Sequence, residues 1–356
     1  TLIPSLPALA QTMPPISYPE TRRGDVVDTM FGERIADPYR WLENDVRKDA
    51  DVADWVSRQN RATRAYLDAL PQRAWFAARL RALLRYERFG LPMKAGGRYF
   101  YTRNSGLQNQ AQLFVRKGLK GKPRLLLDPN AWSADSATAL DAWQPSDEGR
   151  FLLYSVQDGG SDWRVLRVLD VKTGEPLADR IRWAKFTDLA WVGEEGFLYS
   201  RFPAPGEGEA FQARNYDQAV WFHRLGTSQD DDELVYATPD HPEYGHTADV
   251  TQDGRFAIVT STIGTDARYE LHVIDLARRD RHGWAARGLV SGFDNDWKLV
   301  GGVGTVLWFV TNWQAPRYRL VAIDLAEKDP KWHEVIGQRD EILQQGTVIG
   351  DPLVLS

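Results

Sequence analysis

The chain has 356 residues, of which 43% are hydrophobic and 26% charged, and a formal net charge of −5. This composition is typical of a globular protein with a large core and excludes a disordered or collagen-like chain. The 44 basic and 49 acidic residues form no basic block, so we expect no nucleic-acid partner, and no apolar run approaches the ~20 residues that span a bilayer, so we expect no membrane partner. The absence of cysteine excludes disulfides, thiolate nucleophiles and cysteine-based zinc sites.

Residues 1–17 are predicted to be a leader. Within them, Ala8-Leu9-Ala10 ends an apolar stretch and has the Ala-x-Ala pattern of a signal-peptidase cleavage site. Cleavage there would make the protein periplasmic or secreted. The alternative is an ordinary proline-rich leader on a cytoplasmic protein, and the sequence leaves both open.

Residues 18–88 are predicted to form a helical segment. Apolar residues recur at helical spacing over Asp51–Leu70, and again over Gln72–Arg88. Pro71 stands near the start of the second helix, and Gly90 is placed to end it. The Asp37-Pro38-Tyr39-Arg40-Trp41 string before the helices is expected to fix this segment, with its two aromatic side chains supplying buried area.

From residue 89 to residue 356 the apolar period falls to two, in short runs that glycine, aspartate and asparagine interrupt. Two stretches are copies of one unit, since Ser146–Val171 and Thr251–Leu276 share an Asp/Glu-Gly-Arg-Phe turn and a Leu-x-Val-Leu/Ile-Asp strand. Weaker copies surround them. The glycines that open the copies are spaced by 52, 47, 58 and 50 residues and are Gly97, Gly149, Gly196, Gly254 and Gly304.

A period near 50 residues, built from four short strands, predicts a mainly β fold of the β-propeller type. The alternative is a pair of β-sandwiches, which would not need the repeated unit. About five blades fit before Leu343, and a sixth begins near Val348. Since a propeller that ended there would expose an unpaired strand edge, we expect further chain to follow Ser356.

Motifs that carry chemistry are scarce in the chain. The nearest string to a Gly-x-Ser-x-Gly nucleophile elbow lacks the final glycine, so Ser161 is interpreted as a blade-turn residue. His241 and His246 are interpreted as polar loop residues rather than as metal ligands, and no metal site or cofactor is expected. The run Asp230–Glu233 lacks the alternating spacing of an EF-hand loop and is interpreted as a solvated acidic turn.

Four strings occur in an order that resembles the prolyl oligopeptidase family of serine peptidases. They are Asp37-Pro38-Tyr39-Arg40-Trp41-Leu42-Glu43, Asn104-Ser105-Gly106-Leu107-Gln108-Asn109-Gln110, Leu127-Asp128-Pro129-Asn130 and Gly160-Ser161-Asp162-Trp163. The resemblance implies a seven-bladed propeller, of which about five blades are present, inserted after an N-terminal helical segment that packs on an α/β-hydrolase domain. That hydrolase domain, with its catalytic serine, aspartate and histidine, would lie outside this chain.

By the same resemblance, the whole protein would be a monomeric serine endopeptidase that cleaves short peptides after proline. The propeller would shield the active site and select substrates by size. The partners implied are short proline-containing peptides and the hydrolase domain of the same chain. The alternative is a non-catalytic propeller that serves as a binding scaffold.

One substrate-binding residue is carried over from the resemblance. Phe186 stands ahead of Leu189-Ala190-Trp191 and would belong to the apolar subsite beyond the proline pocket. The alternative is a core aromatic residue of the propeller channel. The family's methionine in the next stretch corresponds to Gly245, beside Tyr244, which predicts a wider subsite.

Overall fold

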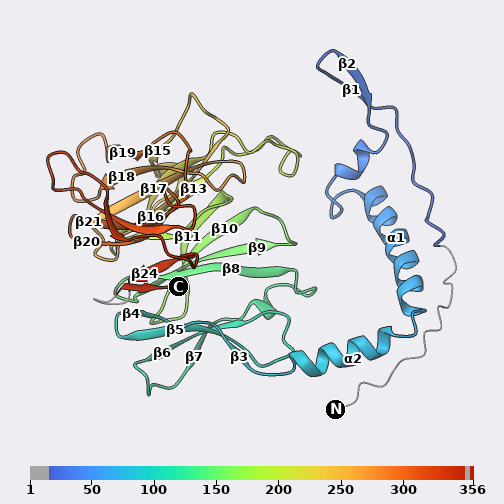
Figure 1. Cartoon of the computed structure of the whole chain (residues 1–356). Coiled ribbons are helices and arrows are strands. Elements are labelled where there is room, and N and C mark those ends of the chain that lie inside the picture. Colours follow the sequence, from blue (N-terminus) through green and yellow to red (C-terminus); the bar gives the residue numbers. More distant parts are fainter. Residues whose placement is uncertain (1–15, 349–352) are drawn as a thin grey trace. The chain divides into compact units, whose positions relative to one another are not determined.

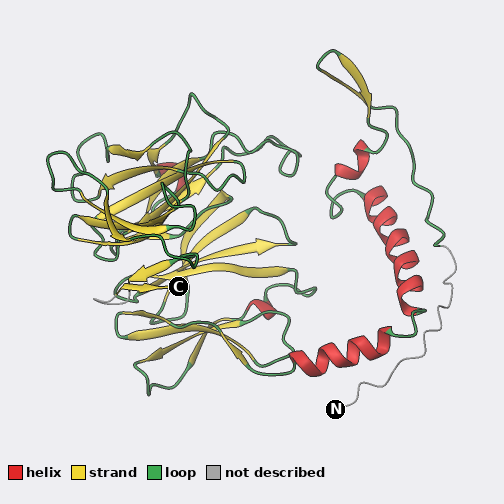
Figure 2. Cartoon of the chain, viewed as in Figure 1, coloured by secondary structure: helices red, strands yellow, loops and turns green. Residues whose placement is uncertain are grey.

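The computed structural model describes residues 16–348 and 353–356, and Figure 1 shows it from one side. The possible cleavage site at Ala8-Leu9-Ala10 lies outside the described residues. The chain divides into two compact units, one of residues up to 85 together with 205–213, and one of residues 86–204 and 214–356. Figure 2 shows that the two α-helices belong to the first unit and that strands dominate the second.

The first unit contains a hairpin, a short 3₁₀ helix and two α-helices. The first helix is confirmed, and Asp49 caps it by accepting hydrogen bonds from the backbone N–H groups of Asp51 and Val52. The second helix ends four residues earlier than expected, at Leu84, because Arg88 and Phe89 pair with the second unit's first blade as strand β3. The elements are β1 (Val27–Met30), β2 (Glu33–Ala36), η1 (Arg40–Glu43), α1 (Ala50–Asp68) and α2 (Arg73–Leu84).

Polar contacts, rather than buried aromatic area, hold the Asp37–Trp41 string in this unit. The Arg40 guanidinium forms ion pairs with Asp37 and Asp28, and the Trp41 indole donates to the Arg22 carbonyl at 3.0 Å. Tyr39 stays 40% exposed. Tyr39 therefore supplies less buried area than expected, whereas Trp41 is partly buried.

The second unit consists of five antiparallel blades, which confirms the predicted propeller type and blade count. In blade 1 two short strands, β3 and β4, take the place of the first strand, since both pair with β5. Blade 1 contains β3 (Arg88–Phe89), β4 (Met93–Ala95), β5 (Arg98–Asn104), β6 (Gln112–Lys117) and β7 (Arg124–Leu127); blade 2 contains β8 (Thr138–Pro145), β9 (Phe151–Asp158), β10 (Arg164–Asp170) and β11 (Pro176–Ala184).

The remaining blades repeat this order. A hairpin of β24 (Gly346–Val348) and β25 (Leu353–Leu355) follows blade 5 where a sixth blade is expected to begin. Blade 3 contains β12 (Ala190–Val192), β13 (Gly196–Arg201), β14 (Ala219–Arg224) and β15 (Glu233–Tyr236); blade 4 contains β16 (Tyr244–Val250), β17 (Phe256–Ile263), β18 (Glu270–Asp275) and β19 (Ala286–Val290); blade 5 contains β20 (Trp297–Val303), β21 (Val306–Thr311), β22 (Arg319–Asp324) and β23 (His333–Ile336).

Apolar clusters fill the contacts between neighbouring blades. Between blades 2 and 3, Leu153 and Leu166 pack with Phe197 and Tyr199, and all four side chains are buried. Similar clusters join blades 1 and 2, 3 and 4, and 4 and 5. Blades 2 and 3 are also one continuous sheet, because Ala184 of β11 pairs with Arg201 of β13.

The two copies of the repeated unit fold alike. Phe151 pairs with Asp170 in blade 2, and Phe256 pairs with Asp275 at the same place in blade 4. No helix in the part of the chain that the structure describes is long and apolar enough to cross a membrane.

Candidate functional site

Loops at one end of blades 2 and 3 form the candidate site. Because successive strands are antiparallel, the loops after β9, β11, β13 and β15 lie at the same end of these blades. We call this the Phe186 end, since Phe186 lies between β11 and β12. The turns after β8, β10, β12 and β14 lie at the other end, which we call the opposite end. Ser161 lies in the loop after β9, as interpreted from the sequence.

Aromatic side chains gather in the loops around Phe186. Trp163 makes edge-to-face contacts with Trp183 and Phe202, at ring-centroid distances of 5.5 and 6.2 Å. The Lys185 ammonium lies 4.8 Å from the centre of the Trp163 ring and 5.4 Å from that of Phe186. Such contacts place a cation and several apolar faces at one loop cluster.

Phe186 is presented by a strained turn. Its backbone has φ = +52°, a left-handed conformation that costs a bulky residue on the order of 1–3 kcal/mol. Its side chain is 55% exposed, so it is not a buried core aromatic in this chain. Its place in a substrate subsite stays a prediction.

A second aromatic group lies at the start of blade 4. Tyr244 stacks on His241 at 4.6 Å and meets Phe293 edge to face at 4.9 Å. The neighbouring Gly245 does not leave an empty space, because a Cβ there would lie 2.9 Å from Oγ1 of Thr262 and 3.2 Å from Oε1 of Gln218. These two side chains occupy the room that a side chain at 245 would need, and the wider subsite stays a prediction.

Two carboxyl groups lie close to the Phe186 turn. The pKa of Asp249 is raised to about 6, first because surrounding protein desolvates it and second because of the negative charge of Asp188. Desolvation also raises the pKa of Asp188, although a hydrogen bond with Thr247 partly opposes this. Asp188 and Asp249 are both exposed. The desolvation therefore reflects the many protein atoms near the two carboxyl groups and not complete burial.

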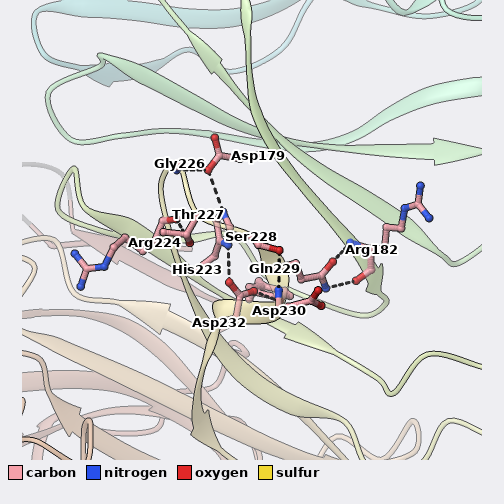
Figure 3. A network of polar contacts seen from close by, with 11 residues as sticks. Asp179, Arg182, His223, Arg224, Gly226, Thr227, Ser228, Gln229, Asp230 and Asp232 are labelled. Atoms are coloured by element: carbon pink, nitrogen blue, oxygen red, sulfur yellow. Dashed lines mark hydrogen bonds and ion pairs between the residues drawn. The ribbon is translucent and has the colours of Figure 1, made fainter.

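A buried histidine between two carboxylates joins blades 2 and 3 (Figure 3). Nε2 of His223 lies 3.0 Å from Oδ1 of Asp179, and its Nδ1 lies 2.6 Å from Oδ1 of Asp232. Asp179 also accepts from the Gly226 N–H at 2.6 Å, and the Tyr199 hydroxyl donates to Asp232 at 2.5 Å. The His223 side chain is 0% exposed, so no substrate can reach it.

This network corrects the interpretation of Asp230–Glu233 as a solvated acidic turn at one residue, Asp232. Asp230 and Asp231 are exposed, but the Asp232 side chain is fully buried, because it contacts His223 of β14 and Tyr199 of β13. Burial lowers the pKa of His223, but its hydrogen bonds with the two carboxylates outweigh this and raise the pKa to about 9. Burial likewise raises the pKa of Asp179, and its hydrogen bonds with His223 and Gly226 bring it below the usual value.

His246 forms a second closed cluster. Its Nδ1 lies 3.0 Å from the Ser261 hydroxyl, and its Nε2 lies 3.0 Å from the Thr238 hydroxyl. His246 and Ser261 are both buried, and burial lowers the pKa of His246 to about 4. The pair is neutral and inaccessible, so it cannot act as a nucleophile with its base. His246 is therefore a buried strand residue, not the loop residue expected from the sequence.

The described residues contain no group of three or more histidine, aspartate or glutamate side chains that could hold a metal ion. The sequence analysis missed Gln218, whose side chain contacts the Phe186 turn, and it missed the His223 network. No local pattern marks Gln218, because its partners lie 28 to 33 residues away, and none marks His223, because Asp179 lies 44 residues before it.

Comparisons with known proteins cover nearly the whole chain. The profile of a family described as prolyl oligopeptidase, N-terminal β-propeller domain, matches residues 18–356. The prolyl endopeptidase of Elizabethkingia meningoseptica is 33% identical over 339 residues, which are 95% of this chain and 47% of that protein. The dual function macrocyclase-peptidase POPB of Galerina marginata is 28% identical over 360 residues, which are 93% of this chain and 48% of that protein.

Solved structures agree with these relatives. One from a study of two prolyl endopeptidases is 45% identical, with a TM-score of 0.71, and the match covers 95% of this chain and 48% of that one. Prolyl oligopeptidase B from Galerina marginata, solved with a 35mer hydrolysis and macrocyclization substrate, is 26% identical with a TM-score of 0.79, over 96% of this chain and 51% of that one. The chain spans about half the length of the relatives it matches.

Proposed function

Since the chain belongs to the prolyl oligopeptidase family, we propose that it is the helical and propeller part of a serine endopeptidase that cleaves short peptides after proline. The observation that carries this proposal is the match of the family's N-terminal propeller domain to residues 18–356. The catalytic serine, histidine and aspartate are proposed to lie in a hydrolase domain outside this chain. The residues of this chain would then bind, orient and shield the substrate rather than react with it.

The propeller is proposed to shield the active site and to select substrates by size. Its blades support this role because apolar side chains fill the contacts between them, which leaves a rigid wall. An active site behind such a wall would admit a flexible peptide but not a folded protein. A wall of this kind would also keep bulk water from the reacting carbonyl.

The hydrolase domain of the same polypeptide is the proposed partner of helix α2. One side of this helix carries apolar side chains that the described chain leaves uncovered, with Trp75, Phe76 and Leu80 all more than half exposed. Patches of this kind mark interaction sites in soluble proteins. We propose that α2 packs this face on the hydrolase domain.

Phe186 is the proposed substrate contact. Phe186 is 55% exposed and lies near other aromatic side chains, such as Trp163 and Trp183. Such a ring is suited to contact an apolar side chain of a peptide. We propose that this ring contacts the part of the substrate that lies upstream of the proline. The residues that form the proline pocket itself would come from outside this chain.

Intact mass spectrometry of the full-length protein before and after reaction with a fluorophosphonate tests the proposal. We expect a mass near twice that of this 40.4 kDa chain and a gain of one label, because a serine with an activating base reacts with this reagent. The labelled protein should lose its activity on a chromogenic peptide, in which the chromogenic group is attached directly after proline. An unlabelled and inactive protein would contradict the proposal and favour the non-catalytic binding scaffold.

A further inference from the structure

The side chain of Gln218 connects three segments of the Phe186 end. Its Nε2 donates to the carbonyl oxygens of Lys185 and Phe186, at 2.8 and 3.2 Å, and its Oε1 accepts from the backbone N–H of His246 at 2.7 Å. Gln218 precedes β14 of blade 3, the two carbonyls belong to the linker between blades 2 and 3, and His246 belongs to blade 4. Gln218 is 3% exposed. Both ends of its buried amide have hydrogen-bond partners, as buried polar groups in folded proteins usually do.

The carbonyl of Phe186 is held at the point where the backbone is strained. A left-handed φ of +52° at a phenylalanine persists only where surrounding contacts fix it. Two of the contacts that fix this turn come from the Gln218 amide. A third comes from the Lys185 ammonium, which donates to Oδ1 of Asn215 at 2.8 Å while lying over the Phe186 ring.

Gly245 makes room for this arrangement. A Cβ at position 245 would lie 3.2 Å from Oε1 of Gln218, which is tighter than ordinary van der Waals contact. A larger residue would therefore push against the amide at the position where it meets the His246 N–H. The glycine at 245 and the glutamine at 218 act as one unit, in which the missing side chain of the first accommodates the second.

We propose that Gln218 is the positioning residue that sets the orientation of the Phe186 ring toward the substrate. The inference rests on the proposed substrate contact of Phe186. Without the amide donor, the carbonyl oxygens of Lys185 and Phe186 lose a partner, and we expect the turn to relax from its left-handed conformation. The ring would then leave the position in which it meets an apolar group upstream of the proline, while the hydrolase residues that carry out the reaction are unaffected.

The test compares two chromogenic peptides that end in proline, cleaved by the full-length protein. One has a single residue before the proline, and the other carries a further phenylalanine upstream. The measured quantity is the ratio of kcat/KM for the extended peptide to kcat/KM for the short one. This ratio does not depend on the concentration of active protein, so partial loss of folded protein by a variant cancels.

The variants are Gln218→Glu, which keeps an acceptor for His246 but removes the donor, and Gln218→Met, which removes both. We expect each variant, like Phe186→Ala, to lower the ratio about 10-fold, because the KM of the extended peptide rises. The kcat for the short peptide should stay unchanged. Gln252→Leu is the matched control. Gln252 also links two blades, because its Oε1 accepts from the Gly302 N–H at 3.2 Å. It lies in the turn after β16, the counterpart in blade 4 of the turns after β8 and β12, and therefore at the opposite end. The ratio measured for Gln252→Leu should stay at the wild-type value.

Three outcomes would count against the proposals. If Phe186→Ala lowers the ratio and neither Gln218 variant does, the positioning inference is wrong and the role of Phe186 stands. If Phe186→Ala leaves the ratio unchanged, the proposed substrate contact is wrong and the inference that rests on it fails as well. If Gln252→Leu lowers the ratio as much as the Gln218 variants, the effect comes from general loosening of the blades and the inference is overturned.

Discussion

At the scale of single residues, His223 is a buried group whose charge affects stability. It is fully buried and holds its proton between Asp179 and Asp232. Removing one partner of a buried charge cluster is strongly destabilising, because the remaining charges stay buried without compensation. Because the pKa of His223 is raised to about 9, this side chain keeps a proton at neutral pH that an ordinary histidine would mostly have lost.

We predict that this contribution to stability falls as the pH rises from about 6.5 to about 9. The pKa of His223 is raised from 6.5 to about 9 in the folded chain, so below 6.5 both states are protonated and the full contribution is present. Between the two values only the folded state keeps the proton, and a contribution on the order of 3 kcal/mol is lost. Thermal unfolding of the full-length protein across this range measures it.

The comparison uses His223→Gln, with His333→Gln as its control. His333 is also a strand histidine, but its side chain is 61% exposed. His223→Gln should destabilise the protein by about 3–5 kcal/mol at pH 6 and by clearly less at pH 9, whereas His333→Gln should follow the wild type. A difference between His223→Gln and wild type that stays constant from pH 6 to pH 9 would show that the proton is not involved.

At the scale of the elements, the repeated unit predicted much of the fold. The period near 50 residues gave the number of blades, and the Asp/Glu-Gly-Arg-Phe copies form equivalent turns in blades 2 and 4. Gly149 and Gly254 both have positive φ there, as the turn chemistry requires. The burial of the Asp232 side chain and the hydrogen bonds of Gln218 with the Phe186 turn could not be predicted. Each depends on contacts between segments that only the folded blades bring together.

We predict that Gly149→Ala is more destabilising than Gly254→Ala. Both residues have left-handed φ values, +61° and +69°, so each substitution pays a conformational cost of about 1–2 kcal/mol. A Cβ at Gly149 would also lie 2.7 Å from the Ala95 carbonyl of blade 1, whereas nothing lies within 4 Å of one at Gly254. The contact adds about 1–3 kcal/mol, by analogy with overpacked cores.

Chemical unfolding of the two variants in the full-length protein measures the difference directly. Because Gly149 and Gly254 occupy equivalent turns of the repeat, the cost of the left-handed backbone conformation is about the same in both variants. It therefore cancels when their free energies of unfolding are compared. Equal destabilisation by the two substitutions would mean that the turn of blade 1 shifts away at little cost, and that the close approach of blades 1 and 2 is not a fixed contact.

At the scale of the whole molecule, the described chain leaves apolar surface at several places. Besides helix α2, blade 1 exposes Phe89, Leu91 and Leu119, by 59%, 91% and 71%. Blade 5 packs one face on only a small cluster that includes Leu355 of the β24–β25 hairpin. Exposed apolar patches mark interaction sites in a protein or make it prone to aggregate.

Expression of residues 1–356 alone should therefore give a protein that aggregates or melts over a broad range and binds a hydrophobic dye. The same residues within the full-length protein should melt sharply, since their apolar faces are then covered. Calorimetry and light scattering on the two proteins measure this. A sharp, reversible and monomeric transition of residues 1–356 would contradict the prediction.

The continuous sheet of blades 2 and 3 has a mechanical consequence. Apolar clusters join each pair of neighbouring blades, and blades 2 and 3 also share a strand pairing at Ala184 and Arg201 and a buried ionic cluster. These additional contacts should make the joint between blades 2 and 3 harder to shear than a joint made by apolar packing alone. Phe186 lies on the linker between these two blades, so the same contacts that join blades 2 and 3 also fix the two ends of the segment that carries it.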